Sequence, residues 1–165
     1  MSVDVAHRSR WETSEVVFGI PFLIGVALQF AVPLSVPPGV LRQVLIPIGG
    51  TLIVVGVAFV VLARREFAQQ GQPTDPGLPT GKVVTTGVFS VSRNPLYLGV
   101  IGALVGVSLA LNVLWVLVLL VPAVAVCHYV LIAPEERYLA GKFGEAYGVY
   151  TASVRRWFGR VRVGH

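Results

Sequence analysis

The stretch GVFSVSRNPLYLG, Gly87 to Gly99, places polar and charged residues directly against a long apolar run. Asparagine is a preferred helix N-cap, and proline is favoured at the first helical position, where its missing N–H costs no hydrogen bond. Asn94 and Pro95 therefore predict a helix that begins near Pro95 and continues from Leu96 onward. Because that helix is apolar enough for lipid, Arg93 and Asn94 are expected where water meets the membrane.

The composition outside this stretch is that of a membrane protein. Of the 165 residues, 55% are hydrophobic and 13% are charged, whereas an ordinary soluble domain has roughly one-quarter charged residues. Several apolar runs are long enough to cross about 30 Å of hydrocarbon. The expected fold class is an all-α integral membrane protein that forms a single domain over residues 1–165.

Four apolar runs are expected to be transmembrane helices. They are Val16–Val32, Val40–Ala63, Leu96–Leu111 and Val113–Ala133. The prolines between Pro33 and Gly39 separate the first two helices. These two helices, residues 16–63, are expected to support the rest of the bundle. Only the region of Asn112 separates the last two, so residues 96–133 should form a tight hairpin. Gly102 and Gly106 have the small-xxx-small spacing that allows close helix approach.

Three polar regions complete the chain. Residues 1–15 carry both signs of charge, and no small-residue cleavage pattern follows the first apolar run, so a retained cytoplasmic N-terminus is expected. Residues 64–95 form a loop rich in Pro and Gly, and a loop of this length in a compact protein is often functional. Apolar residues at steps of three or four predict an amphipathic interfacial helix over residues 134–160.

The basic residues predict the orientation in the membrane. Of the 13 Lys and Arg residues, only Arg42 lies on the side opposite the N-terminus, the long loop and the tail. The positive-inside rule therefore predicts that the site faces the cytoplasm, in a bacterial cytoplasmic membrane. The net charge of +5 is expected to face anionic headgroups. The sequence has no DNA-binding motif, and neither nucleic acid nor an obligate protein partner is inferred.

Three polar groups are expected to meet at the cytoplasmic face. They are the loop of residues 80–86, the Arg93-Asn94 pair with Tyr97, and the Glu135-Glu136 pair. The predicted hairpin places the start of one helix and the end of the other at the same membrane depth, so these groups should be neighbours. Arg93 and Glu136 are the candidate catalytic residues of the resulting polar cup.

Each of these side chains also has a simpler interpretation. Glu135 and Glu136 would begin the last helix, where acidic side chains stabilise an N-terminus by roughly 0.3–1 kcal/mol. Arg93 could anchor a helix end to phosphate headgroups, Asn94 could be only a cap, and Tyr97 could be an interfacial aromatic residue. These alternatives stay open at the level of sequence.

The cysteine and the histidines of the chain show no pattern typical of a catalytic or metal site. Cys127 and His128 lie in an apolar run and are expected to be buried packing residues. The histidines His7, His128 and His165 are scattered, and the chain contains no H-x-x-x-H or C-x-x-C spacing. No metal site is therefore expected.

Two segments, TTGVFSVSRNPLYLG and PEERYLAGKFGEAYGVYTASVRRW, together resemble the isoprenylcysteine carboxyl methyltransferase and phospholipid methyltransferase superfamily of membrane enzymes. The superfamily pattern is G-x-[YF]-x-x-x-R-[HN]-P-x-Y-x-G, followed by E-E-x-x-L-x-x-x-F-G-x-x-Y-x-x-Y. The resemblance covers residues 80–157, and the two pieces in this order are far more specific than either alone.

The resemblance implies a methyltransferase that uses S-adenosylmethionine and acts on a lipid-like or amphipathic acceptor. The cofactor-binding residues that it implies are Lys82, Val83, Val84, Phe89, Asn94, Pro95, Tyr97 and Glu135. Methyl transfer from a sulfonium mainly requires alignment, so Glu135 is expected to bind the cofactor and not to act as a base. The arginine that faces the substrate carboxylate in the prenylcysteine enzymes corresponds to Leu131, which argues against a prenylated cysteine acceptor.

Two other classes remain as alternatives. Membrane sterol and steroid reductases share the R-x-P-x-Y resemblance and use NADPH, but they are generally longer, and this chain shows no extra basic site for a 2′-phosphate. A non-enzymatic small membrane protein or a proton-coupled transporter is the other alternative. Such a transporter needs an ionisable residue in mid-membrane, and the first two apolar runs contain none.

Overall fold

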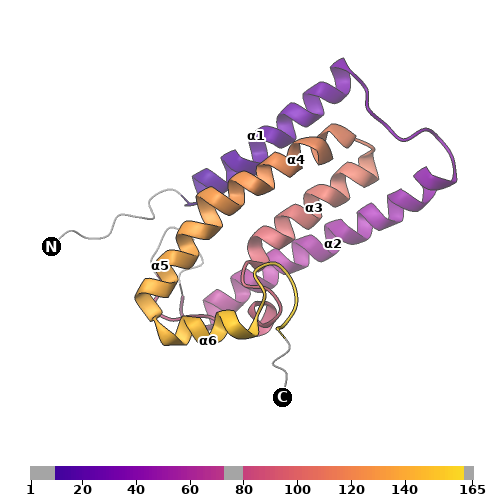
Figure 1. The fold of residues 1–165 in the computed structure, drawn as a ribbon. Helices are drawn as coiled ribbons and strands as arrows, with labels where there is room; N and C mark the ends of the chain where they lie inside the picture. Colours follow the sequence, from indigo (N-terminus) through magenta and orange to yellow (C-terminus); the bar gives the residue numbers. More distant parts are fainter. Residues whose placement is uncertain (1–9, 73–79, 162–165) are drawn as a thin grey trace.

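The computed structural model describes residues 10–72 and 80–161, with side chains from residue 15 onward. The predictions for residues 1–9, for the loop residues 73–79 and for His7 and His165 lie outside these ranges. Within them the regular structure is helical, apart from one isolated antiparallel bridge between Val154 and Arg160. The elements, in chain order, are α1 (Arg10–Ala31), α2 (Val40–Gln69), the short 3-10 helix η1 (Gly87–Ser90), α3 (Pro95–Leu111), α4 (Leu114–Val126), the π-helix η2 (Cys127–Ile132), α5 (Ala133–Phe143) and α6 (Glu145–Ser153) (Figure 1).

Two helices are long and apolar enough to cross a membrane. They cover Val40–Gln69 and Leu114–Phe143, and each has 30 residues. Two shorter apolar helices cover Glu15–Ala31 and Pro95–Leu111. Large apolar side chains lie on the outside of the helices, including Phe30, which is 86% exposed. So much exposed apolar surface is unfavourable in water and is matched by lipid tails, which indicates a membrane protein.

Helices α2 and α3 pack side by side with their backbones in contact (Figure 1). A Cβ atom added to Gly56 would lie 2.5 Å from the carbonyl oxygen of Gly99, and one added to Gly49 would lie 2.6 Å from that of Gly106. For Gly102, the nearest atom would be 3.9 Å away, on Gly56. The close contact therefore uses glycines seven residues apart on each helix, and of the predicted Gly102–Gly106 pair only Gly106 takes part.

The tight turn predicted at Asn112 is present between α3 and α4. Asn112 has a left-handed backbone with φ 61°, a conformation that asparagine tolerates better than most residues. Its side-chain amide donates to the carbonyl of Val36 and accepts from the N–H of Val36, at 3.0 and 2.9 Å. At the same end, the Arg42 guanidinium donates to the carbonyls of Leu109 and Ala110, at 3.0 and 2.8 Å. Arg42 therefore satisfies the last carbonyls of α3.

The fourth apolar run and the start of the C-terminal helix, predicted as separate helices over 113–133 and 134–160, form one continuous helix. Helix α4 passes through η2 into α5 without interruption, and Ile132, directly before α5, keeps helical backbone angles of φ −72° and ψ −50°. Pro134 removes one backbone donor, but the wider π turn immediately before it accommodates the proline ring and the missing bond. Because no free helix N-terminus exists here, the macrodipole interpretation of Glu135 and Glu136 is wrong.

The C-terminal helix differs from the single predicted segment of residues 134–160. Helix α5 ends at Gly144, whose φ of 51° and ψ of −121° turn the chain. Helix α6 then runs beneath the bundle (Figure 1). Beyond it, residues 154–160 form a turn closed by a hydrogen bond from the N–H of Arg155 to the carbonyl of Gly159, at 2.8 Å. We call residues 154–160 the C-terminal turn.

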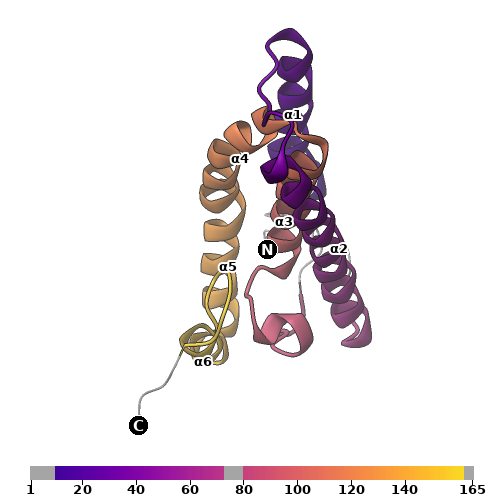
Figure 2. The ribbon, with the colours of Figure 1, turned by 90° about the vertical axis from the view of Figure 1, so that its right-hand side faces the viewer.

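Figure 2 shows η1, α6 and the C-terminal end of α2 gathered at one end of the helices, opposite the turn between α3 and α4. Inside the bundle, buried residues of α1, α4 and η2 form a cluster against which α3 packs. Trp157 of the C-terminal turn also packs on this cluster. The end that carries η1 and α6 is where the polar residues gather.

Candidate active site

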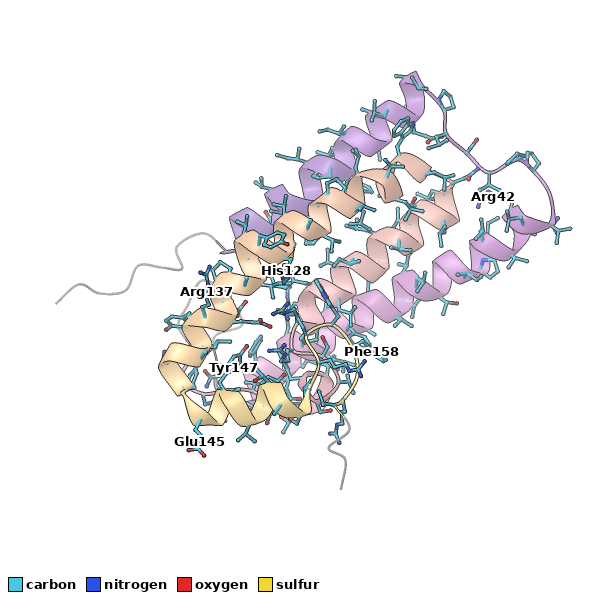
Figure 3. The ribbon with its side chains drawn as sticks, in the orientation of Figure 1. Arg42, His128, Arg137, Glu145, Tyr147 and Phe158 are labelled. Carbon is cyan, nitrogen blue, oxygen red and sulfur yellow. The ribbon has the colours of Figure 1, made fainter. Side chains whose placement is uncertain are left out.

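A cavity lies at the end of the bundle where the segment of residues 80–94 meets α5 and α6. It contains about 500 Å³ of empty space, counting the part that opens to solvent. The residues that line it are Phe67, Thr80, Lys82, Val83, Val84, Phe89, Arg93, Asn94, Glu135, Glu136, Leu139, Tyr147 and Tyr150. Figure 3 shows Tyr147 pointing from α6 into this region, while Glu145 on the same helix points away from it.

Glu136 lies between two arginines in the wall of the cavity. The Nη1 atom of Arg93 is 3.1 Å from Oε1 of Glu136. The Arg156 guanidinium binds both carboxylate oxygens, with Nε 3.0 Å from Oε1 and Nη2 2.6 Å from Oε2. This hydrogen bonding raises the pKa of Arg156 above its ordinary value. The carboxylate is thus held by a two-point contact from one arginine and a single contact from the other.

Arg93 keeps one hydrogen-bond donor unused. Its side chain is only 14% exposed, and its Nε atom is buried without a hydrogen-bond partner. An unpaired buried donor is costly, and in a native protein it calls for a reason such as a ligand. Because Arg93 lines the cavity, this covered Nε lies within the cavity wall, beside the space that a bound carboxylate or hydroxyl group would occupy.

Asn94 occupies the N-cap position of α3 but does not cap the helix with its side chain. No side-chain capping bond is present, and its backbone has φ −129° and ψ 55°. Instead, its Nδ2 atom donates to the carbonyl of Arg156 at 3.2 Å, and its N–H donates to Oγ of Ser92 at 3.1 Å. The expectation that Asn94 acts as a side-chain cap is therefore wrong, and its amide connects the cavity to the C-terminal turn.

Two tyrosines of α6 close the side of the cavity next to η1. The Tyr150 phenol donates to the carbonyl of Phe89 at 2.7 Å, and burial raises the pKa of Tyr150 well above its ordinary value. Burial also raises the pKa of Tyr147, and the negative charge of Glu136 adds to this while Arg93 opposes it. Both phenols are therefore neutral donors at physiological pH.

The loop over the cavity is fixed at both of its described ends. Lys142 donates from Nζ to the carbonyl of Thr80 at 2.8 Å. At the other end, the Thr86 hydroxyl donates to Glu66 near the end of α2. Between them, Val83 packs on the tyrosine cluster of α6, and Val84 is buried with Phe89. The loop backbone is thereby held against the cavity.

Most of the residues predicted for the site come together. Those that line the cavity are Lys82, Val83, Val84, Phe89, Arg93, Asn94, Glu135 and Glu136. Pro95 and Tyr97 do not line it, because Pro95 is fully buried at the start of α3 and Tyr97 packs on the apolar cluster of α1, α4 and η2. These two residues form the layer behind the cavity wall.

Sequence reasoning missed four lining residues and one residue behind them. The four lining residues are Phe67, Leu139, Tyr147 and Tyr150, and the residue behind them is Arg156; Thr80, which also lines the cavity, belongs to the loop that was expected there. The F-G-x-x-Y-x-x-Y part of the superfamily pattern contains both tyrosines and was the available signal for them. Arg156 had no such signal, because its partner Glu136 is 20 residues away and meets it only through the bend at Gly144.

Two other expectations concern residues away from the cavity. His128 lies on η2, where its ring makes an edge contact with Tyr129 at 4.9 Å between centroids, and it does not line the cavity (Figure 3). Among the residues that the structure describes, no group of three or more His, Cys, Asp or Glu side chains is placed to hold a metal ion.

The fold is a bundle of apolar helices, as in membrane proteins, and both charged and apolar side chains line a cavity at its end. Residues 44–146 match the phospholipid methyltransferase family, and the chain belongs to that family. The superfamily indicated by the sequence is thereby confirmed, and membership points to a membrane methyltransferase. Comparison with curated proteins and with solved structures gives no match. Tyr147, Tyr150 and Arg156 lie beyond the matched range.

Proposed function

We propose that this protein transfers a methyl group from S-adenosylmethionine to an apolar or amphipathic acceptor at the cytoplasmic face of the membrane. The observation that carries the proposal is the meeting of Arg93 and Asn94 with Glu135 and Glu136 in one cavity at the end of an apolar bundle. Family membership supplies the reaction class, and the cavity supplies groups suited to the cofactor.

The lining residues fit the chemistry of this cofactor. S-adenosylmethionine carries an ammonium group, a carboxylate, ribose hydroxyls, a purine and a sulfonium, and when bound it supplies an electrophilic methyl group. Glu135 is suited to hold the ammonium group or the ribose hydroxyls, and the unpartnered Nε of Arg93 is suited to the carboxylate. Aromatic faces such as that of Phe89 attract a cation or stack on a purine. The backbone of residues 82–84 lines the same space.

The residues of the chain contribute mainly by positioning and by excluding water. Holding two reactants in line supplies about 7–11 kcal/mol of a barrier, so transfer from a sulfonium requires few dedicated catalytic side chains. Arg93 and Glu136 fix each other in the wall through their ion pair. Pro95 and Tyr97 support Asn94 from behind, so we assign them to positioning the motif.

The membrane arrangement that goes with this function has four spans. Besides the two long helices, Glu15–Ala31 and Pro95–Leu111 have 17 residues each, and a helix of this length is about 26 Å long, near the lower limit for a span. Residues 16–63 then support the site, 64–95 carry the cofactor loop, 96–133 form the hairpin, and α5 and α6 lie at the interface. The excess of Lys and Arg at the cavity end supports a cytoplasmic position for the cavity, and the membrane that we propose is the bacterial cytoplasmic membrane.

Equilibrium binding to the detergent-purified protein tests the proposal. S-adenosylmethionine and S-adenosylhomocysteine should bind in titration calorimetry, and NADPH should not. Glu135→Gln should weaken binding by about tenfold or more, because hydrogen bonds to a charged group contribute about 1.5–3 kcal/mol. Glu145→Gln is the matched control, since Glu145 points away from the cavity (Figure 3). Binding of NADPH alone would show that the protein is a reductase.

The acceptor class has a separate test. Wild-type protein is incubated with labelled S-adenosylmethionine and a total lipid extract, and the label is followed into the organic phase. Label in lipid that depends on Glu135 would support a lipid-type acceptor. Label that stays in the aqueous phase would contradict it while leaving cofactor binding intact.

A further inference from the structure

We propose that Arg156 of the C-terminal turn is a positioning residue for the cofactor, which acts by occupying Glu136 so that Arg93 keeps a free donor in the cavity. This inference rests on the proposed function. It extends the site to residues beyond the range that matches the family, which ends at residue 146.

The backbone of the C-terminal turn is attached to the segment that carries Arg93. The N–H of Arg93 donates to the carbonyl of Arg155 at 3.2 Å, and the N–H of Gly159 donates to the carbonyl of Val91 at 2.7 Å. The amide of Asn94 reaches the carbonyl of Arg156 at 3.2 Å. These three hydrogen bonds therefore join the turn to the segment of residues 91–94, although more than 60 residues separate them in the chain.

The position of Arg156 along the turn is fixed on both sides. Gly159 holds the far side of the turn with φ 100°, a left-handed conformation that suits glycine. Trp157, the next residue after Arg156, packs on the apolar cluster of α1, α4 and η2, where Tyr97 also packs. With its neighbours anchored in this way, the backbone holds Arg156 at the distance from which its side chain reaches Glu136.

The hydrogen bonds of Glu136 explain why the contact with Arg156 matters for Arg93. Arg156 contacts both carboxylate oxygens, whereas Arg93 contacts only Oε1. A planar guanidinium is well matched to such two-point binding, and a lysine is not. With Arg156 removed, Oε2 loses its partner, and the other arginine that already contacts this carboxylate is Arg93. Arg93 would then turn its remaining donors toward Glu136, and the Nε that is now unpartnered would leave the cavity.

The test is calorimetric titration of S-adenosylhomocysteine into detergent-purified variants. Arg156→Gln should raise the dissociation constant roughly tenfold, within the range of coupling measured inside one ion-pair network. Arg156→Lys should recover little of this loss, because lysine makes a single contact. Arg155→Gln is the matched control, since Arg155 is the exposed neighbouring arginine, and it should bind as the wild type does.

A double-variant cycle separates this role from general support of the fold. In the Arg93→Gln background, Arg156→Gln should cause no further loss, because the donor that it protects is already absent. If Arg156→Gln weakens the binding of S-adenosylhomocysteine equally in the wild-type and Arg93→Gln backgrounds, the inference is overturned. Wild-type affinity in Arg156→Gln would also overturn it. If Arg156→Gln does not fold, Arg156→Lys carries the same cycle. Wild-type protein that binds neither S-adenosylmethionine nor S-adenosylhomocysteine would instead defeat the proposed function.

Discussion

The phenol of Tyr150 donates a hydrogen bond to the carbonyl of Phe89, 2.7 Å away, and so joins α6 to the short helix that precedes Asn94. Both residues are buried, at 6% exposure each. The bond connects two of the cavity walls across a separation of 61 residues.

Loss of this bond should destabilise the protein. Tyr150→Phe leaves the carbonyl of Phe89 buried without its donor, which is expected to cost about 1–3 kcal/mol of unfolding free energy. Thermal unfolding in detergent measures the effect. Tyr129→Phe is the matched control, because Tyr129 is 71% exposed, and its midpoint should stay at the wild-type value. A Tyr150→Phe midpoint equal to that of the wild type would contradict the prediction.

The role of Asn94 is separable from helix capping. Aspartate is as good an N-cap as asparagine, but it cannot donate to the carbonyl of Arg156. Asn94→Asp should therefore destabilise the protein by about 1–3 kcal/mol and loosen the C-terminal turn. Thermal unfolding together with hydrogen exchange of the backbone at residues 155–160 would show both effects. Unchanged stability and exchange would mean that the side chain does act as a cap.

The contact between α2 and α3 predicts different results for two glycines of α2, Gly56 and Gly50. Gly56→Ala places a methyl group against the backbone of Gly99 and should cost about 1–3 kcal/mol through overpacking. Gly50→Ala meets open space and should be neutral or stabilising by up to about 1 kcal/mol, because alanine is the better helix former. Equal midpoints in thermal unfolding would argue against the packed arrangement.

The buried tyrosines predict loss of stability in alkali. Burial raises the pKa of both Tyr147 and Tyr150, whereas tyrosine in an unfolded chain titrates near about pH 10. Above that pH the unfolded state binds fewer protons than the native state, so stability falls as pH rises; below it, both states keep their protons.

Unfolding midpoints measured from about pH 8 to 11 should show this decline, and a Tyr147→Phe and Tyr150→Phe double variant should flatten it. Tyr129→Phe is again the control and should keep the wild-type slope. A double variant that declines as steeply as the wild type would assign the alkaline sensitivity to other groups.

The all-helical fold and the polar end of the bundle were predictable from local patterns. Asn94-Pro95 marks the start of α3 correctly, and the left-handed turn at Asn112 returns the chain beside it. That return alone brings Glu135 and Glu136 to the depth of Arg93, because the two helices run in opposite directions from one turn. Local sequence patterns were therefore sufficient to predict the relative position of two helices that a single turn connects.

Other features depend on contacts that no local pattern contains. Pro134 is a strong break signal, yet η2 absorbs it because a π turn redistributes the backbone hydrogen bonds over the preceding residues. Gly106 contacts α2 and not α4, the other helix of the hairpin. The spacing of small residues in the sequence does not indicate which helix will pack against them. Arg156 reaches Glu136 through a bend at Gly144 and a turn held by backbone bonds, neither of which depends on a recognisable side-chain pattern.

We expect the uninterrupted helix from Leu114 to Phe143 to couple the position of Glu135 and Glu136 to the thickness of the bilayer. Glu135 and Glu136 belong to the same continuous helix as the apolar residues that face lipid. A thicker or thinner bilayer that tilts this helix would therefore move both carboxylates. Arg93 sits at the start of a different, shorter helix and would respond by a different amount. The lipid environment thereby becomes a determinant of how well the two halves of the cavity align.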